Sequence, residues 1–199
     1  MLSLIGYRGV GKTSVAQLLA LRLGWDWVDA DVEIELRAGK SIAAIFADDG
    51  EPAFRDLESA VIAELTGVGQ PSRLSKDKRD AFPTPDLTGQ AGTPLHEVSR
   101  LVLACGGGAV LRLENRQALQ AAGKVVWLQA RPETILERIA TDATTAGRRP
   151  QLTTSGGAIE VQELLAQRLP LYQQCANLTI DTEGKSPAEV AEEILARLN

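Results

Sequence analysis

Short apolar runs alternate along the chain with longer segments in which apolar residues recur three or four positions apart. An unbroken apolar run is typical of a buried strand, and the longer spacing is typical of one helix face. Five strands are predicted, in the segments MLSLIG, WDWVDAD, LVLACGGG, KVVWLQA and LTIDT, which begin at residues 1, 25, 101, 124 and 178.

Helix start and stop signals lie between these strands. Ser41 and Ser186 occupy predicted N-cap positions, Pro187 follows at the first helical position, and Pro170 is expected to interrupt a helix. The helical segments are the one that ends at residue 24 and the ranges 32–39, 41–50, 51–67, 115–123, 131–142, 165–176 and 186–199. Alternating strands and helices predict an α/β fold: a five-stranded parallel sheet with helices on both faces and right-handed crossovers.

Two segments break this alternation. Residues 67–100 hold four of the nine prolines and little apolar periodicity, which indicates a loop insertion or a partly disordered one. Residues 141–157 are polar and rich in Gly and Thr around the letters RRP, so they form either a mobile lid or an ordinary surface loop. The 199 residues otherwise fit a single domain, 1–199.

Charge and cysteine content narrow the class of protein. A net charge of -5 argues against a general nucleic-acid or anionic-membrane binder. No apolar run approaches the length of a membrane span, and the N-terminus lacks the basic leader of a signal peptide. Cys105 and Cys175 have no metal-binding or redox spacing, so we expect packed, reduced thiols and a cytoplasmic location.

A glycine-rich motif joins the first strand to the first helix. The letters GYRGVGKT, Gly6 to Thr13, fit G-x-x-x-x-G-K-[ST] in full. Glycines let backbone amides turn onto phosphate oxygens, and the helix N-terminus favours the negative charge. The motif predicts ATP binding, with Lys12 on the β- and γ-phosphates and the Thr13 hydroxyl on Mg²⁺.

Two aspartates, Asp29 and Asp31, follow the second predicted strand. If the segment is extended, residues two apart share a face, so both carboxylates could point toward the phosphate site. One would hold water on Mg²⁺ and the other would accept a hydrogen bond from an acceptor hydroxyl. A solvated turn or an N-cap is the alternative interpretation.

Other candidate residues are less informative alone. Gly106 to Gly108 follow a buried strand, which indicates either close backbone approach to a ligand or a tight turn. Arg55 and Arg168 could simply face solvent. Arg149, beside Pro150 in the predicted lid, is a candidate charge clamp over the phosphates.

Together these stretches resemble the shikimate kinase family. The resemblance runs along nearly the whole chain except 67–100, and its most telling part is SIAAIFADDGEPAFRDLE. The other resembling stretches are GYRGVGKTS, DADVEIE, LACGGGAV, RRP, QRLPLY and SPAEVAEEIL. The resemblance implies a three-layer α/β/α P-loop kinase fold with a mobile lid.

The resemblance also implies site roles. Lys12, Asp31 and Arg149 would be catalytic, Thr13 and (through water) Asp29 would hold Mg²⁺, and Asp31 would bind the acceptor hydroxyls. Arg55 and Arg168 would bind the substrate carboxylate, with the backbone of Gly106, Gly107 and Gly108 lining the same pocket. The implied ATP-binding residues are Gly9, Val10, Gly11, Lys12, Thr13, Ser14, Arg138, Arg149, Lys185 and Pro187.

This sequence departs from the family pattern at three places. Lys185 stands where the family usually has an arginine beside adenine, and the 67–100 connection is normally a short turn. The lid is a few residues longer than usual, which leaves Arg148 as an alternative clamp, although Arg149 directly before Pro150 fits better.

The resulting hypothesis is a monomeric kinase that moves the γ-phosphoryl of ATP to the 3-hydroxyl of shikimate with Mg²⁺. No nucleic-acid or membrane partner is expected. Two alternatives stay open: a gluconate or nucleoside monophosphate kinase of the same fold, and a non-catalytic relative that acts as a binding module.

Overall fold

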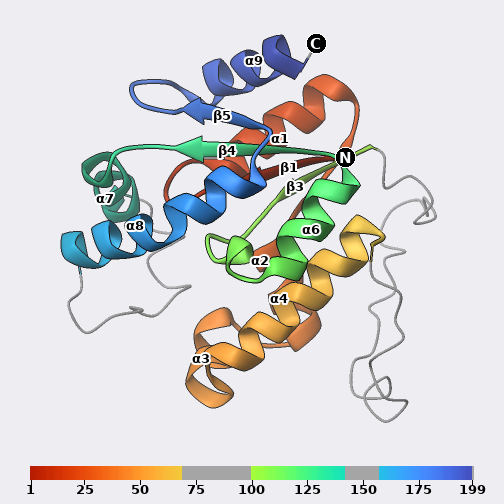
Figure 1. Ribbon diagram of the computed structural model, residues 1–199, viewed down its shortest axis with the longest axis vertical. Helices are drawn as coiled ribbons and strands as arrows, with labels where there is room; N and C mark the ends of the chain where they lie inside the picture. Colours follow the sequence, from red (N-terminus) through yellow and green to blue (C-terminus); the bar gives the residue numbers. More distant parts are fainter. Residues whose placement is uncertain (69–99, 142–156, 199) are drawn as a thin grey trace.

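The computed structural model describes residues 1–68, 100–141 and 157–198. Its strands are β1 (Leu2–Ile5), β2 (Asp26–Asp29), β3 (Leu101–Ala104), β4 (Lys124–Gln129) and β5 (Leu178–Asp181). They form one parallel sheet in the order β2-β3-β1-β4-β5 (Figure 1). The predicted five-stranded parallel sheet is therefore confirmed.

Helices cover both faces of this sheet. They are α1 (Lys12–Leu23), α2 (Ala30–Ala38), α3 (Ile42–Asp48), α4 (Gly50–Thr66), the 3-10 turn η2 (Ala109–Leu111), α6 (Leu113–Ala122), α7 (Pro132–Thr141), α8 (Gly157–Cys175) and α9 (Pro187–Leu198). Helices α1 and α9 pack together on one face, and α4 and α6 pack together on the other. The predicted three-layer α/β/α architecture is confirmed.

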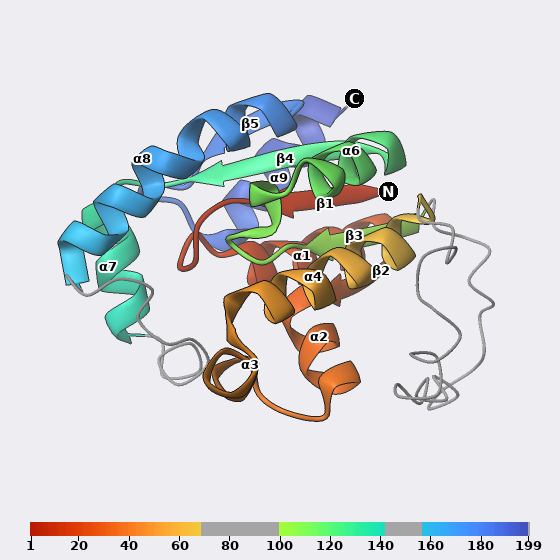
Figure 2. The ribbon, with the colours of Figure 1, turned by 60° about the horizontal axis from the view of Figure 1, so that its bottom comes forward.

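Alternate residues of the inner strands feed two separate cores. Leu2 and Leu4 of β1 join the core under α1 and α9, whereas Ile5 joins the core under α2, α3, α4 and α6. Strand side chains alternate between faces, so a strand buried on both sides is largely apolar, and β1 has one buried polar residue, Ser3. Helix α8 contributes to both cores, and Figure 2 shows α7 and the start of α8 beyond the ends of the strands.

Two predicted helix caps are present. The Ser41 hydroxyl accepts a hydrogen bond from the Ala44 amide (3.2 Å) at the start of α3. At the start of α9, the Ser186 hydroxyl accepts from the Glu189 amide (3.3 Å), while the Glu189 carboxylate accepts from the Ser186 amide (2.7 Å). This reciprocal pair is a capping box.

The predicted interruption at Pro170 is wrong, because α8 continues through it to Cys175. Proline has no amide to donate to the Ala166 carbonyl, and an interior proline costs a helix about 3 kcal/mol. Tyr172 and Cys175 lie beyond it and are 1% and 0% exposed. Burial of large side chains yields about 1.5–3 kcal/mol each, so the tertiary packing of this last turn offsets the cost of the proline.

The predicted insertion, 67–100, and the predicted lid, 141–157, fall largely outside the described residues, and so do Arg148 and Arg149. Within the described ranges, none of the helices combines the length and apolar character that crossing a bilayer requires. Cys105 and Cys175 are both buried and free, as predicted.

Candidate active site at the carboxyl ends of the strands

The glycine-rich loop leads from the central strand β1 into α1. Gly6, Gly9 and Gly11 have φ values of 139°, 81° and 88°, which other residues rarely adopt. A methyl group on Gly6 would also overlap the Leu128 carbonyl oxygen. Gly11 is the N-cap of α1 and has no side chain to cover the first amides of the helix. The loop therefore leaves a helix N-terminus open to an anion.

Lys12 and Thr13 are the first two residues of α1, as the motif predicts. The Lys12 ammonium donates hydrogen bonds to the carbonyl oxygens of Gly6 (2.9 Å) and Tyr7 (2.8 Å). Its charge is thereby held at the loop, where phosphate oxygens would lie.

The two aspartates are not arranged as an extended segment would place them. Asp29 is the N-cap of α2: its Oδ1 accepts a hydrogen bond from the Asp31 amide (3.0 Å). Asp31 therefore lies in the first helical turn, and the prediction that both carboxylates share a strand face is wrong. The reason is local, since an aspartate that caps a helix ends the extended conformation at itself.

The second oxygen of Asp29 connects α2 to the glycine-rich loop. Its Oδ2 accepts a hydrogen bond from the Thr13 hydroxyl at 2.7 Å, so two oxygen atoms that could bind a cation meet at the start of α1. No cluster of three or more His, Cys, Asp or Glu side chains suited to a metal occurs in the described residues. The pair fits Mg²⁺, which binds one or two protein oxygens and completes its shell with phosphate and water.

The turn from Gly106 to Gly108 follows β3 and lies between the glycine-rich loop and α4. A methyl group on Gly107 would sit 3.4 Å from the Arg8 amide nitrogen and 3.6 Å from the Gly6 carbonyl oxygen. A methyl group on Gly108 would overlap the Arg55 guanidinium. Gly107 therefore contacts the glycine-rich loop, and Gly108 contacts the Arg55 guanidinium.

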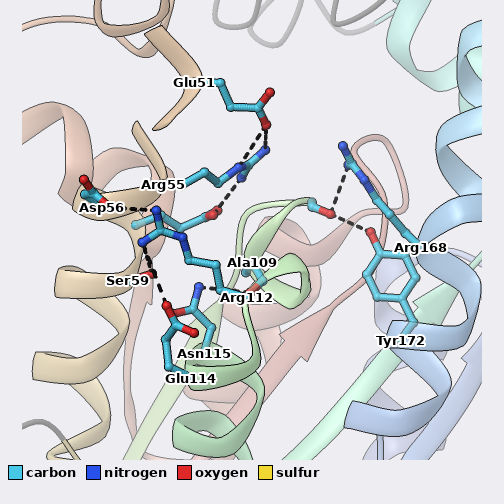
Figure 3. Close-up of polar contacts among 12 residues, drawn as sticks. Glu51, Arg55, Asp56, Ser59, Ala109, Arg112, Glu114, Asn115, Arg168 and Tyr172 are labelled. Carbon is cyan, nitrogen blue, oxygen red and sulfur yellow. Dashed lines mark hydrogen bonds and ion pairs between the residues drawn. The ribbon is translucent and has the colours of Figure 1, made fainter. Parts of the chain in front are cut away.

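Arg55 projects from α4 and is 6% exposed. Its Nε and Nη2 donate to Glu51 Oε1 at 3.1 and 2.9 Å, and its Nη1 donates to Glu58 Oε2 at 2.7 Å (Figure 3). Glu58 is fully buried. Because carboxylates hold two sides of the planar fork, the orientation of the guanidinium is fixed.

Arg168 projects from α8 on the other side of the turn and is 5% exposed. Its Nη1 donates to the Gly107 carbonyl oxygen at 3.2 Å, and its guanidinium lies 5.7 Å from the centre of the Tyr7 ring. The structure therefore brings Arg55, Arg168 and the glycine turn together beside the phosphate loop.

Sequence reasoning missed four residues of this region. Glu51 and Glu58 hold Arg55, and their spacing of four and three residues from it along one helix was the available signal. Tyr7 and Arg8 lie inside the glycine-rich motif; Tyr7 is 2% exposed, and the Arg8 guanidinium lies 5.9 Å from its ring centre.

The charges of this region converge on the end of β3. Burial raises the pKa of the Cys105 thiol well above its usual value; Cys175, Glu58 and Asp31 raise it further, while Lys12 lowers it. Lys12 comes from α1, Asp31 from α2 and Glu58 from α4. With Cys175 from α8, side chains of four helices thus act on one point directly before the glycine turn.

A cavity of about 150 Å³ adjoins the glycine-rich loop and is lined in part by Val10, Gly11, Arg138, Lys185 and Pro187. Arg138 donates to the Thr182 hydroxyl (2.9 Å) and carbonyl (2.8 Å). The residues predicted at the adenine therefore meet in space.

A sequence model of the shikimate kinase family matches residues 8–69 and 92–199. The chain belongs to the shikimate kinase family. The part between the two matched ranges, residues 70–91, lies within the predicted insertion.

Individual relatives agree with this family assignment. The chain is 42% identical over 197 residues to the shikimate kinase of Pseudomonas savastanoi pv. phaseolicola, a match that covers 99% of this chain and 95% of the relative. It is 40% identical over 194 residues to the shikimate kinase of Rhodopirellula baltica, with 98% and 88% covered. A solved structure of shikimate kinase from Acinetobacter baumannii in complex with shikimate has a TM-score of 0.78 and 32% identity, and covers 99% of this chain and 91% of its own.

Proposed function

We propose that this kinase transfers the γ-phosphoryl group of ATP to the 3-hydroxyl of shikimate, with Mg²⁺ as cofactor. The observation that carries the proposal is the placement of two buried arginines, Arg55 and Arg168, on either side of a glycine turn that touches the phosphate loop. Membership of the shikimate kinase family supports it independently.

The nucleotide would occupy the glycine-rich loop. The amides of Gly9 to Ser14 and the Lys12 ammonium would hold its phosphates, and Arg138, Lys185 and Pro187 would flank its adenine. Thr13 and (through water) Asp29 would hold Mg²⁺, which would supply positive charge to neutralise the phosphates. The 2.7 Å contact between these two side chains supports that pairing.

The acceptor would lie between α2, α4 and α8. Asp31 would accept the hydrogen bond of the reacting hydroxyl and orient it toward the γ-phosphoryl group. Arg55 and Arg168 would bind the carboxylate, since a planar guanidinium can pair with both carboxylate oxygens. The backbone of Gly106 to Gly108 would line the same pocket.

Charge and position would supply most of the rate enhancement. Phosphoryl transfer passes through a loose transition state. Holding the attacking and leaving oxygens in line and neutralising charge therefore matter more than covalent chemistry. Lys12 would supply one positive charge. Arg149, which lies outside the described residues, would supply a second from the lid.

The wider organisation is also a proposal. We infer one kinase domain over 1–199, with 67–100 as a loop insertion and 141–157 as a lid, acting as a monomer in the cytoplasm. The family match on both sides of residues 70–91 supports an insertion within 67–100.

A coupled assay of ADP release tests the function. Purified protein is supplied with Mg²⁺-ATP and, in turn, with shikimate, gluconate and nucleoside monophosphates. Only shikimate should give turnover well above the background ATPase rate. The Lys12→Ala variant, prepared identically, should lose about 10²–10³ in rate and so control for a contaminating kinase. Faster turnover with gluconate or a monophosphate would replace the proposal, and no turnover with any acceptor would favour a binding module.

A further inference from the structure

The carbonyl oxygen of Gly107 accepts two side-chain hydrogen bonds, both from α8. The Tyr172 hydroxyl donates at 2.6 Å and Arg168 Nη1 at 3.2 Å, and Figure 3 shows both side chains reaching the same point of the loop. The two donors are four residues apart, so they lie on one face of the helix. The shorter bond therefore comes from the tyrosine.

The position of the Tyr172 hydroxyl is determined by its surroundings. Tyr172 is 1% exposed, and its ring stacks on Trp127 of β4 with centres 5.6 Å apart and planes 18° apart. The sheet and α8 together thus aim the hydroxyl at Gly107. Without this donor, the Gly107 carbonyl would keep only the longer hydrogen bond from Arg168.

The two hydrogen bonds to the Gly107 carbonyl also determine the direction of the Gly108 amide. The Gly107 carbonyl and the Gly108 amide belong to one planar trans peptide, so they point in opposite directions. With the oxygen directed at α8, the amide hydrogen is directed away from α8. Gly108 is also the residue against which the Arg55 guanidinium lies. Consecutive glycines impose little preference of their own, so the orientation needs an external hold.

Neighbouring carbonyls of the turn are held by other residues. The Gly106 oxygen accepts from the Ala109 amide (3.1 Å), and the Ala109 oxygen accepts from the Asn115 side chain (3.0 Å). These bonds are made within the turn and with α6. The peptide between Gly107 and Gly108 is the one that α8 holds.

We propose that Tyr172 is a positioning residue for substrate binding. Its hydroxyl sets the Gly107–Gly108 peptide so that the Gly108 amide, beside Arg55, donates to the carboxylate of the acceptor. The inference rests on the proposed function, which supplies an acceptor with a carboxylate.

Tyr172→Phe tests this role, because it removes the hydroxyl and keeps the ring that stacks on Trp127. We expect the KM for shikimate to rise about 3- to 10-fold, on the scale of one neutral hydrogen bond, while the KM for ATP stays unchanged. The preference for shikimate over its methyl ester should fall by a similar factor, because the Gly108 amide acts on the carboxylate. A calorimetric titration with shikimate gives the dissociation constant without turnover.

Gln120→Met is the matched control. Gln120 donates to the carbonyl oxygens of Gln174 (2.9 Å) and Cys175 (3.3 Å) at the end of α8, so this variant loosens the same helix without touching the glycine turn. It should lower the melting temperature and leave the preference for acid over ester unchanged.

Three results would overturn the inference. The first is a Tyr172→Phe variant that prefers shikimate over its methyl ester as strongly as the wild-type protein does. The second is an equal loss of this preference in Gln120→Met. The third is a Tyr172→Phe chain that does not fold, because a positioning role does not require the hydroxyl for folding. Failure of the wild-type protein to phosphorylate shikimate would instead refute the proposed function, and it would be seen before any variant is compared.

Discussion

At the scale of single residues, Gly108 shows how a neighbour can require a glycine. Its backbone angles, φ −102° and ψ 0°, lie outside the left-handed region, so other residues could adopt them. A methyl group there would nevertheless overlap the Arg55 guanidinium, which two glutamates hold in place. The lack of a side chain at Gly108 therefore makes room for the arginine.

Gly108→Ala should displace Arg55 and weaken acceptor binding selectively. We expect a rise of about 10- to 150-fold in the KM for shikimate, the scale of one charged hydrogen bond, with the KM for ATP preserved. Gly107→Ala is the comparison, because a methyl group there makes only ordinary contacts and should cost less. Steady-state kinetics of both variants check this; equal effects would mean that Arg55 does not contact the substrate.

The residues that a motif fixes could be predicted, and the residues that only the fold brings close could not. Lys12 and Thr13 follow from the spacing of the glycine-rich motif, which depends on one loop and one helix. Tyr172 bonds to Gly107, 65 positions away, and was not predicted. Thr13 and Asp29, 16 positions apart, were assigned to the same Mg²⁺ only through the family resemblance. A local pattern does not report such partners.

At the scale of elements, both errors of prediction concern where a helix begins or ends. Asp29 and Asp31 fit an extended segment and an N-cap equally well by spacing. The hydrogen bond from the Asp31 amide to the Asp29 side chain shows that the N-cap is correct for Asp29. Pro170 would end an isolated helix. In this fold the burial of Tyr172 and Cys175 keeps the helix going, and a rule based on local helix propensity does not include such burial.

The capping box of α9 makes a prediction about pH. Hydrogen bonds from Ser186 hold the pKa of Glu189 below its usual value. A carboxylate with a lowered folded-state pKa stabilises the fold above its unfolded pKa, about 4.3, and loses that effect as the pH falls through the folded value. Glu189→Gln should therefore lower the melting temperature at pH 7, and the gap to wild type should close in acid.

Glu192→Gln is the control for this measurement. It neutralises a carboxylate on the same helix that pairs with Arg22 at 2.9 Å in an exposed position, where ion pairs contribute little. Its effect on the melting temperature should be smaller. A gap for Glu189→Gln that is the same at pH 7 and pH 3 would show that the ionised carboxylate does not support the cap.

At the scale of the whole molecule, the family match divides the chain into a kinase and an additional segment. Residues 70–91 lie outside the matched ranges, between α4 and β3. Replacing them by a short Gly/Ser linker should leave kcat and the KM for shikimate within about twofold, because loop length changes closure entropy only slowly. Kinetics and melting curves, with a scrambled segment of equal length as control, check this. Lost activity in a chain that melts normally would assign the segment a part in catalysis.

The alternation of strands and helices predicts the five strands and the three layers, but it does not predict which strands are neighbours. Strand β2, which carries Asp29, is not the neighbour of β1 in the sheet, because β3 lies between them. Thr13 and Asp29 still meet, because α1 crosses over β3 to connect the two. Strand order depends on long-range pairing, which a local pattern of apolar residues does not specify.

That strand order has a consequence for the chain as it leaves the ribosome. Strand β1 pairs with β3 and β4, and Leu2 lies opposite Val102 and Lys124. The backbone of β1 therefore has no strand to pair with on either side until these residues have been synthesised. At a synthesis rate of about 5–20 residues per second, the first partner arrives roughly 5–20 s later. During this interval the apolar segment Leu2–Ile5 has no partner strand, and the glycine-rich loop that follows it is not held by a folded sheet. Until β3 has been made, this apolar segment is therefore exposed to intermolecular contacts that favour aggregation.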